Sequence, residues 1–294
     1  MMEQGGNKQG GAAEMVISEH RIASAQGEVY ACRWQPAQAD TQAETQVGNE
    51  VPIVLLHDSL GSVELWRDFP AALCAATGRV VIAYDRAGFG RSAVRVDPLA
   101  ADFITREAQQ GFAAVREHFA LEQFILFGHS VGGGMAVHCA AQWPQHCVAL
   151  ITEAAQAFVE DRTVAGIEEA RELFADPAQR QRLARYHGER TDWVLNAWIG
   201  SWLAPSFADW SLRAVLPQVR CPLLAIHGEE DEYGSPAHPE LIVALAGGAT
   251  QCAVLPGVRH VPHREASGQV LTLVTDFLQA CSSAPFQAGN ALTV

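Results

Sequence analysis

Residues 124–134 read FILFGHSVGGG, and this stretch decides both the fold and the chemistry to look for. FILF is a short apolar run, typical of a strand that is buried on both faces. Gly-His-Ser-Val-Gly follows at 128–132, and small residues continue into a predicted helix over 131–143. A strand that turns through G-x-S-x-G into a helix lifts the serine hydroxyl above the edge of the sheet. Ser130 is therefore the candidate nucleophile.

Apolar, β-branched runs on both sides of this stretch predict further strands. Strands are predicted at 15–23, 28–34, 53–56, 80–84, 124–127, 148–152, 223–227 and 252–255, and helices at 63–77, 101–119, 131–143 and 267–280. Alternation of strands and helices is typical of a parallel sheet with helices on both faces. We therefore predict an α/β fold with a mostly parallel, doubly wound sheet. Ligands of such sheets bind at the carboxyl ends of the strands.

One segment interrupts this alternation. Residues 156–212 have a helical pattern broken by Gly and Pro, and they contain four of the seven tryptophans. We predict an inserted helical cap at 156–212, between a first core part at 14–155 and a second at 213–281. Trp198 and Trp202 are four residues apart, so they share one helical face and are the candidate pocket residues. Residues 37–50 are predicted to be a loop, 1–13 a disordered leader and 282–294 a tail.

The composition narrows the range of partners. The 294 residues are 49% hydrophobic and 18% charged, with a net charge of −13. This excludes bulk disorder and disfavours nucleic acid and anionic membrane surfaces as partners. No apolar stretch is long enough to span a membrane, and no secretory signal is apparent. The seven cysteines form no C-x-x-C pair, which favours reduced thiols in the cytoplasm. We expect a small-molecule partner, and the sequence leaves the oligomeric state open.

Cofactor motifs are missing from the sequence. There is no H-E-x-x-H or C-x-x-C metal motif, and no glycine-rich nucleotide-binding loop opens a strand–helix unit. His57, His129 and His227 each follow a strand as single residues, so a structural role is the simplest interpretation for each. We therefore predict neither a metal nor a cofactor.

A serine nucleophile needs a base and an acid, which follow it along the chain in the order acid, then histidine. Asp231 lies in the run GEEDE after the strand predicted at 223–227, and His260 lies in the loop after the last strand. We assign Asp231 as the acid and His260 as the base. Glu153, at the end of the strand predicted at 148–152, is the alternative acid. His263 begins a predicted helix, where a surface or capping role is expected.

The tetrahedral intermediate of acyl transfer needs two N–H donors at its oxyanion. The residue directly after the nucleophile, Val131, supplies one in this type of fold, and the loop after the first parallel strand supplies the other. That loop reads HDSLGS at 57–62. We assign the second donor to the backbone of Ser59.

Taken together, these motifs resemble the α/β-hydrolase superfamily over residues 14–281. The resemblance rests on VLLHDSLGS at 54–62, YDRAGFGRS at 84–92, GHSVGG at 128–133, LLAIHGEEDEYGSP at 223–236 and LPGVRHVPHRE at 255–265. It implies a Ser130–Asp231–His260 triad, an oxyanion hole at Ser59 and Val131, and a helical cap over the site. Ser130 separates the chain from epoxide hydrolases and haloalkane dehalogenases, which carry an aspartate at the elbow.

Within the superfamily, the segment at 59–61 resembles that of enol-lactone hydrolases, and the general layout is similar to valacyclovir-hydrolase-like esterases. Those esterases hold a substrate amine with an acid directly after the serine, so Val131 disfavours an amino-acid ester. Asp58 and Arg259 also stand where many relatives have glycine. The resemblance implies a serine esterase or lactonase, and the aromatic residues of the predicted cap favour a small apolar or aromatic metabolite as the substrate. A C–C hydrolase of meta-cleavage products, or a small-molecule receptor with residual activity, are the alternatives.

Overall fold

The computed structural model describes residues 15–37 and 51–283. The predicted leader at 1–13 lies outside the described residues, as do residues 38–50 of the predicted loop and 284–294 of the predicted tail. Within the described ranges, no helix combines the length and the apolarity that crossing a bilayer requires.

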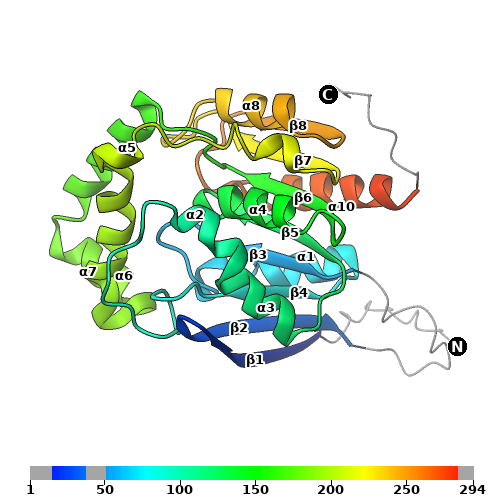
Figure 1. Cartoon of the computed structure of the whole chain (residues 1–294), viewed down its shortest axis with the longest axis horizontal. Coiled ribbons are helices and arrows are strands. Elements are labelled where there is room, and N and C mark those ends of the chain that lie inside the picture. The colour runs from blue at the N-terminus through cyan, green and yellow to red at the C-terminus, as the bar shows by residue number, and fades with distance from the viewer. Residues whose placement is uncertain (1–14, 38–50, 284–294) are drawn as a thin grey trace, which may run out of the picture.

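The core of the molecule is an eight-stranded sheet (Figure 1). Its strands are β1 (Met15–Ser24), β2 (Gly27–Pro36), β3 (Ile53–Leu56), β4 (Val81–Tyr84), β5 (Phe124–His129), β6 (Cys147–Glu153), β7 (Leu223–Gly228) and β8 (Thr250–Leu255). The strand order is β1-β2-β4-β3-β5-β6-β7-β8. Strands β1 and β2 pair antiparallel, as do β2 and β4, and all other pairs are parallel. The predicted mostly parallel sheet is confirmed.

Both faces of the sheet are covered by helices, which explains the continuous apolar strands. Every residue of β3, β4 and β5 is buried. The helices α1 (Phe69–Thr77) and α10 (Ser267–Ser283) pack on one face. On the other face lie α2 (Phe103–Arg106), α3 (Gly111–His118), α4 (Val131–Gln142) and α8 (Ala237–Leu245). With both faces covered, only the strand ends and the connecting loops are available for ligands.

The helices depart from the prediction in three places. The helix predicted at 63–77 is broken, because Arg67 takes a left-handed backbone with φ 53° between a 3-10 turn at Glu64–Trp66 and α1. The helix predicted at 101–119 is divided at Gln110, whose φ of −116° and ψ of −91° are not helical. Helix α8 was not predicted, because prolines occupy its start; Pro239 is tolerated in the first turn, where no helical N–H bond is needed.

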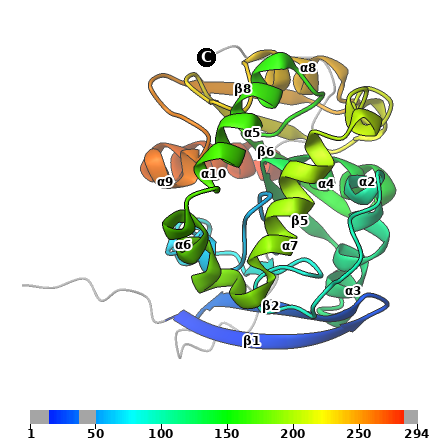
Figure 2. The same ribbon diagram turned by 90° about the vertical axis from the view of Figure 1, so that its left-hand side faces the viewer.

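The segment between β6 and β7 forms a separate layer at one end of the sheet. It contains α5 (Asp161–Leu173), α6 (Pro177–His187), α7 (Thr191–Leu195) and a π-helical turn at Asn196–Gly200. Figure 1 shows these helices at the left, apart from the helices that cover the two sheet faces, and Figure 2 views them from that side. The segment begins and ends side by side, since Phe158 and Ser211 form an isolated antiparallel bridge.

Candidate active site

The turn from β5 into α4 is sterically demanding, and the glycines make it possible. Ser130 has φ 55° and ψ −126°, a backbone conformation that residues other than glycine rarely adopt. A Cβ at Gly128 would lie 2.3 Å from the carbonyl oxygen of Gly132, and one at Gly132 would lie 2.2 Å from that of Leu56. Only glycine therefore fits at 128 and 132, and the sharp turn projects the Ser130 side chain beyond the end of the strand.

The structure brings the three predicted residues Ser130, His260 and Asp231 together. Nε2 of His260 lies 3.0 Å from Oγ of Ser130. Nδ1 of His260 lies 2.9 and 2.8 Å from the two carboxylate oxygens of Asp231. All three side chains are buried. This is hydrogen-bonding distance at both ends of one imidazole, the arrangement in which a histidine accepts a serine proton while a carboxylate fixes its tautomer.

Backbone contacts between the two loops hold His260 close to Asp231. Gly228 ends β7 so close to the histidine loop that a Cβ there would lie 2.1 Å from the carbonyl oxygen of Arg259. The N–H of Glu230 donates to the carbonyl of Val258 at 2.9 Å. Only glycine allows the end of β7 to approach the histidine loop this closely.

Opposed effects set the protonation of this pair. Burial acts to lower the pKa of His260, but the charge of Asp231 and its hydrogen bond outweigh burial and raise the pKa above its ordinary value. Asp58 and Glu232 raise the pKa of His260 further. Burial acts to raise the pKa of Asp231, but His260 and the backbone N–H of Tyr233, which donates to Oδ1 at 2.7 Å, contribute to a lowered pKa. Asp231 is thus ionised, and His260 is a strengthened base.

The residues predicted to supply the oxyanion donors are Val131, which follows Ser130 in the chain, and Ser59, which lines the same cavity as Ser130. Val131 is the first residue of α4, so its N–H has no carbonyl one turn back to accept it. Because Gly132 packs against the carbonyl of Leu56, the start of α4 meets the loop that follows β3. Ser59 in that loop lines the same cavity as Ser130. This is where a helix start and a turn can present N–H groups to one oxygen.

A cavity of about 230 Å³ opens above Ser130. It is lined by Asp58, Ser59, Leu60, Ser130, Gln156, Thr163, Ile167, Trp198, Trp202, Glu232, Tyr233, His260 and Val261. Both predicted pocket tryptophans are among these residues, and they come from the segment between β6 and β7. The lining includes two acidic side chains, and no lysine or arginine is present among the described residues that form it. The cavity is small and mostly apolar, and one of its two acidic residues, Glu232, is paired with Arg259 at 3.4 Å.

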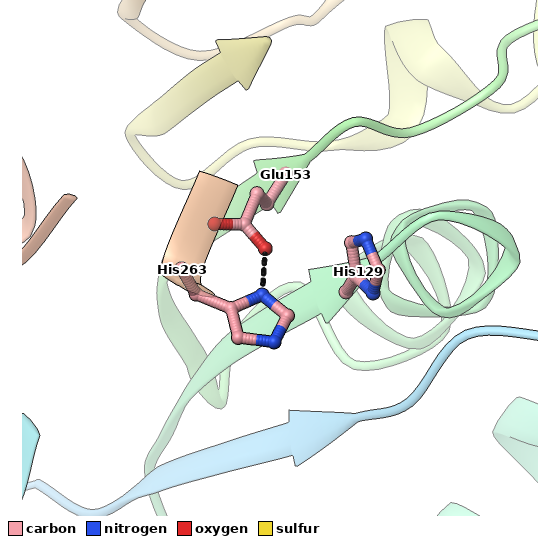
Figure 3. A group of neighbouring side chains, drawn as sticks. All are labelled: His129, Glu153 and His263. Atoms are coloured by element: carbon pink, nitrogen blue, oxygen red, sulfur yellow. Dashed lines mark hydrogen bonds and ion pairs between the residues drawn. The ribbon is translucent and has the colours of Figure 1, made fainter. Parts of the chain in front are cut away.

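The alternative acid, Glu153, does not contact His260 but pairs with another histidine (Figure 3). Oε2 of Glu153 lies 2.5 Å from Nδ1 of His263. The expectation of a surface or capping role for His263 is wrong: its side chain is buried against the rings of Trp66 and Phe69. Helix α9 has only four residues, which is too few for a hydrophobic periodicity to predict that His263 faces inward.

A third residue, His129, completes this buried group. Its ring packs edge-on against that of His263 at 4.9 Å, and its Nε2 lies 2.8 Å from the backbone carbonyl of His260. His129, Glu153 and His263 offer potential metal-ligating atoms within 4.8 Å of one another. One of these contacts is already made between protein groups, since Glu153 and His263 bond each other. The three residues lie far apart in the sequence, which does not predict that they meet.

Two further polar residues near the triad were not predicted. Gln156, just after β6, lies with its Oε1 3.4 Å from Oγ of Ser130 and lines the cavity. Glu265 accepts the N–H groups of Arg259 and Val261 at 2.8 and 3.0 Å, and so braces the peptides on both sides of His260. The sequence offers one sign of a role for either residue, which is its distance from a predicted site residue. Gln156 lies three residues after Glu153, and Glu265 lies five residues after His260.

Comparisons with known proteins find similarity to hydrolases. The profile of the family described as alpha/beta hydrolase fold matches residues 51–196. Serine hydrolase BPHL of Homo sapiens is 27% identical over 233 residues, covering 77% of this chain and 79% of its own. The family match therefore spans β3 to β6 and the first part of the segment between β6 and β7.

Solved structures share the fold. The enol-lactonase from Burkholderia xenovorans has a TM-score of 0.66 at 20% identity, covering 88% of this chain and 100% of its own. The 2-hydroxy-6-oxo-6-phenylhexa-2,4-dienoate hydrolase from Rhodococcus has a TM-score of 0.73 at 14% identity, covering 90% and 100%. At these identities the likeness concerns the fold and carries no information on substrate.

Proposed function

The chain belongs to the α/β-hydrolase superfamily and is a hydrolase, and from this premise we propose that it cleaves a carboxylic ester or lactone through a Ser130–His260–Asp231 triad. The observation that carries the proposal is the continuous contact from Oγ of Ser130 through the His260 imidazole to Asp231, at 3.0 and 2.8 Å. The name of the relative, a serine hydrolase, supports the same nucleophile.

The proposed reaction has two halves. Ser130 Oγ attacks the carbonyl carbon while Nε2 of His260 takes its proton, and the N–H groups of Ser59 and Val131 stabilise the oxyanion. The carbon–oxygen bond breaks as His260 returns the proton to the leaving alkoxide, which leaves an acyl-enzyme. Water then attacks the acyl-enzyme, giving a proton to His260, and the acid product departs as Ser130 regains its hydrogen.

The substrate that suits the cavity is small, with an apolar or aromatic group. The tryptophans at 198 and 202 supply the apolar wall, and we propose that the segment 156–212 acts as a cap over Ser130. Asp58 adds negative charge to the cavity lining, whereas Glu232 is paired with Arg259 at 3.4 Å, and the charge of Asp58 opposes a substrate carboxylate. A dienoate, the substrate class in the name of one structural neighbour, carries such a group. The lining therefore favours a neutral ester or lactone over C–C cleavage of a meta-cleavage product.

The proposal is tested with p-nitrophenyl esters of increasing chain length and the Ser130→Ala variant. Wild-type protein should turn over many equivalents of a short ester, whereas the variant should lose several orders of magnitude in kcat. A serine-directed phosphonate should label wild type once, at Ser130, and leave the variant unmodified. Equal turnover by the two proteins contradicts the proposal, and so does a wild type that stops after one equivalent, as a receptor would.

The charge argument has its own matched pair of substrates. The p-nitrophenyl esters of butyrate and of hemisuccinate have similar length, and only the second carries a carboxylate. We expect kcat/KM to be at least about tenfold lower for the anionic ester at low salt, with the gap narrowing as salt screens the two carboxylates. The Asp58→Asn variant should narrow it as well. A preference for the anionic ester contradicts the proposed substrate class.

A further inference from the structure

The mechanism uses the side chain of His260, and Glu265 holds the N–H groups of the residues on either side of it, which leaves the carbonyl of His260 itself to be accounted for. His260 lies on a loop between β8 and the short helix α9 (Pro262–Glu265). A loop residue must be held by contacts, because its peptide units have no strand or helix partners of their own. An imidazole with both nitrogens engaged tolerates little movement of its backbone. The buried group behind the triad, His129 with the pair Glu153–His263, has no part in the chemistry described so far.

We propose that His129 is a positioning residue, which fixes the main chain of His260 through its hydrogen bond to the carbonyl of that residue. The pair Glu153–His263 then anchors the chain just after this loop. This inference rests on the proposed function, because it concerns the same triad. The contact joins Nε2 of His129 to the carbonyl oxygen of His260 at 2.8 Å.

The direction of this hydrogen bond is fixed by its acceptor. A carbonyl oxygen cannot donate, so Nε2 of His129 must carry the proton. Burial, with the neighbouring His263, lowers the pKa of His129 to about 4, so the ring is neutral at ordinary pH. A neutral ring with its proton on Nε2 donates to the carbonyl without placing a positive charge beside the His260 imidazole. A permanently charged donor there would weaken the base.

The position of His129 next to Ser130 links the nucleophile to the main chain of its base. His129 is the last residue of β5 and immediately precedes Ser130. One rigid strand end therefore carries the nucleophile and also holds the backbone of its base. Movement of the histidine loop relative to β5 would change the 3.0 Å separation of Oγ and Nε2 directly. Proton transfer is sensitive to such changes, since misplacement by about 1 Å can cost about a hundredfold in rate.

The pair Glu153–His263 holds α9, the short helix that directly follows this loop. Glu153 ends β6, the strand beside β5, and it bonds His263 at 2.5 Å. The rings of Trp66 and Phe69 pack on His263 at centroid distances of 4.7 and 5.2 Å. The loop and α9 are thus attached to two adjacent strands, at the carbonyl of residue 260 and at the side chain of residue 263.

The test compares substitutions of His129 that differ in whether a donor reaches the carbonyl. A glutamine places its amide N–H near the position of Nε2, whereas an asparagine is too short and a leucine has no donor. We expect His129→Leu and His129→Asn to lower kcat between about tenfold and a hundredfold, with KM within about twofold of wild type. His129→Gln should restore kcat to within about threefold of wild type.

Thermal unfolding of each variant controls for a merely structural role. If His129→Leu does not fold, the comparison of Asn with Gln still decides, because both are polar and of related shape. Folded Asn and Leu variants with wild-type kcat overturn the inference. So does a Gln variant as impaired as Asn, since the donor would then not matter.

Two further measurements separate the positioning role from a failure of the triad itself and from metal binding. Phosphonate labelling of wild-type Ser130 tests the proposed function separately: without labelling that function fails, whereas labelling with no effect of residue 129 overturns only the positioning role. Metal analysis of the purified protein is the second. We expect no bound metal and no change in kcat with a chelator. One equivalent of a transition metal, lost together with activity, would show that the three residues are ligands and overturn the positioning role.

Discussion

Among the residues that the structure describes, two buried histidine–carboxylate pairs have their histidines only three residues apart, and the two pairs behave in opposite ways. In both, Nδ1 of a histidine that follows β8 meets a carboxylate that lies at or just beyond the end of a parallel strand: His260 with Asp231 after β7, and His263 with Glu153 at the end of β6. The first pair faces a cavity through Nε2, whereas the second lies behind it, among aromatic rings. The same two residue types therefore serve different purposes, according to what surrounds them.

The carboxylates show why the pairs differ. Asp231 accepts from His260 and from the N–H of Tyr233, so its charge is stabilised and its pKa lies below the ordinary value even though burial opposes this. Glu153 is fully buried, and its Oε1 finds no hydrogen-bond partner among the described residues. Burial raises the pKa of Glu153 to about 7. A buried carboxylate stays charged only when enough donors surround it.

The largest difference should appear when each histidine is removed. His260→Ala removes the base, and we expect kcat to fall by about four orders of magnitude or more while the fold persists. His263→Ala leaves Glu153 without its partner and opens a cavity, so it should lower the free energy of unfolding by about 2–4 kcal/mol. The kcat of its folded fraction should fall less than about tenfold. Steady-state kinetics and denaturant unfolding separate the two effects, and a His263→Ala enzyme as inactive as His260→Ala contradicts the assignment.

Substitution of the two carboxylates should also lower kcat more in the first pair than in the second, with a smaller difference than between the two histidines. Asp231→Asn keeps the shape of the side chain but presents an N–H to Nδ1 of His260, which favours the wrong tautomer, and we expect kcat to fall about 10²- to 10⁴-fold. Glu153→Gln changes a group that is already partly neutral at pH 7, so kcat should stay within about threefold. If Glu153→Gln proved the more damaging of the two, Glu153 would have to be reconsidered as the acid.

Sequence reasoning found the first pair and missed the second for a physical reason. The fold class and Ser130 follow from patterns that are local: an apolar strand, a turn that only glycine permits, and a helix. Asp231 and His260 follow from their places after successive strands. Glu153 and His263 also follow strands, so their positions alone could not say which histidine each carboxylate meets. That choice depends on side-chain direction across neighbouring strands, which one sequence does not record.

The same limit explains the other departures. Glu265 and Gln156 act through contacts with backbone or with Oγ that leave no periodic trace in the sequence. The break near Arg67 places an unfavourable backbone conformation on a residue with no turn preference, so propensity alone predicts an unbroken helix. For Glu265 and Gln156 the role is set by a single contact and not by a repeating pattern.

The two pairs should also be distinguished by pH. The base must be neutral to accept the serine proton, so kcat/KM should fall as pH drops through the pKa of His260, which Asp231 raises above 6.5 in spite of burial. The loss should reach about a hundredfold over the two pH units below that pKa. Glu153→Gln should leave this limb in place, because Glu153 belongs to the other pair. Profiles of kcat/KM from pH 5 to 9 for both proteins check this, and loss of the limb in Glu153→Gln would contradict it.

The smallest expected effect concerns stability and follows from proton counting. Burial raises the pKa of Glu153 from 4.5 to about 7 and, with Arg264, lowers that of His263 from 6.5 to about 3. A raised folded-state pKa contributes stability at low pH that is lost as pH rises toward 7, whereas a lowered one costs stability as pH falls below 6.5. Between pH 5 and 7 the two contributions cancel. Near pH 6 the unfolded pair holds most of one proton on the histidine, and the folded pair holds most of one proton on the glutamate.

Glu153→Gln should expose the histidine contribution by removing the compensating one. When pH drops from 7 to 5, the free energy of unfolding of this variant should fall by about 2 kcal/mol more than that of wild type. At pH 5 His263 binds a proton in the unfolded chain but stays neutral in the folded protein. Urea unfolding at both pH values measures the difference, and the double variant with His263→Gln is the matched control, since it should lose the extra pH dependence. Parallel curves for wild type and Glu153→Gln would mean that Glu153 is charged in the folded protein, and that the two pairs are electrostatically alike after all.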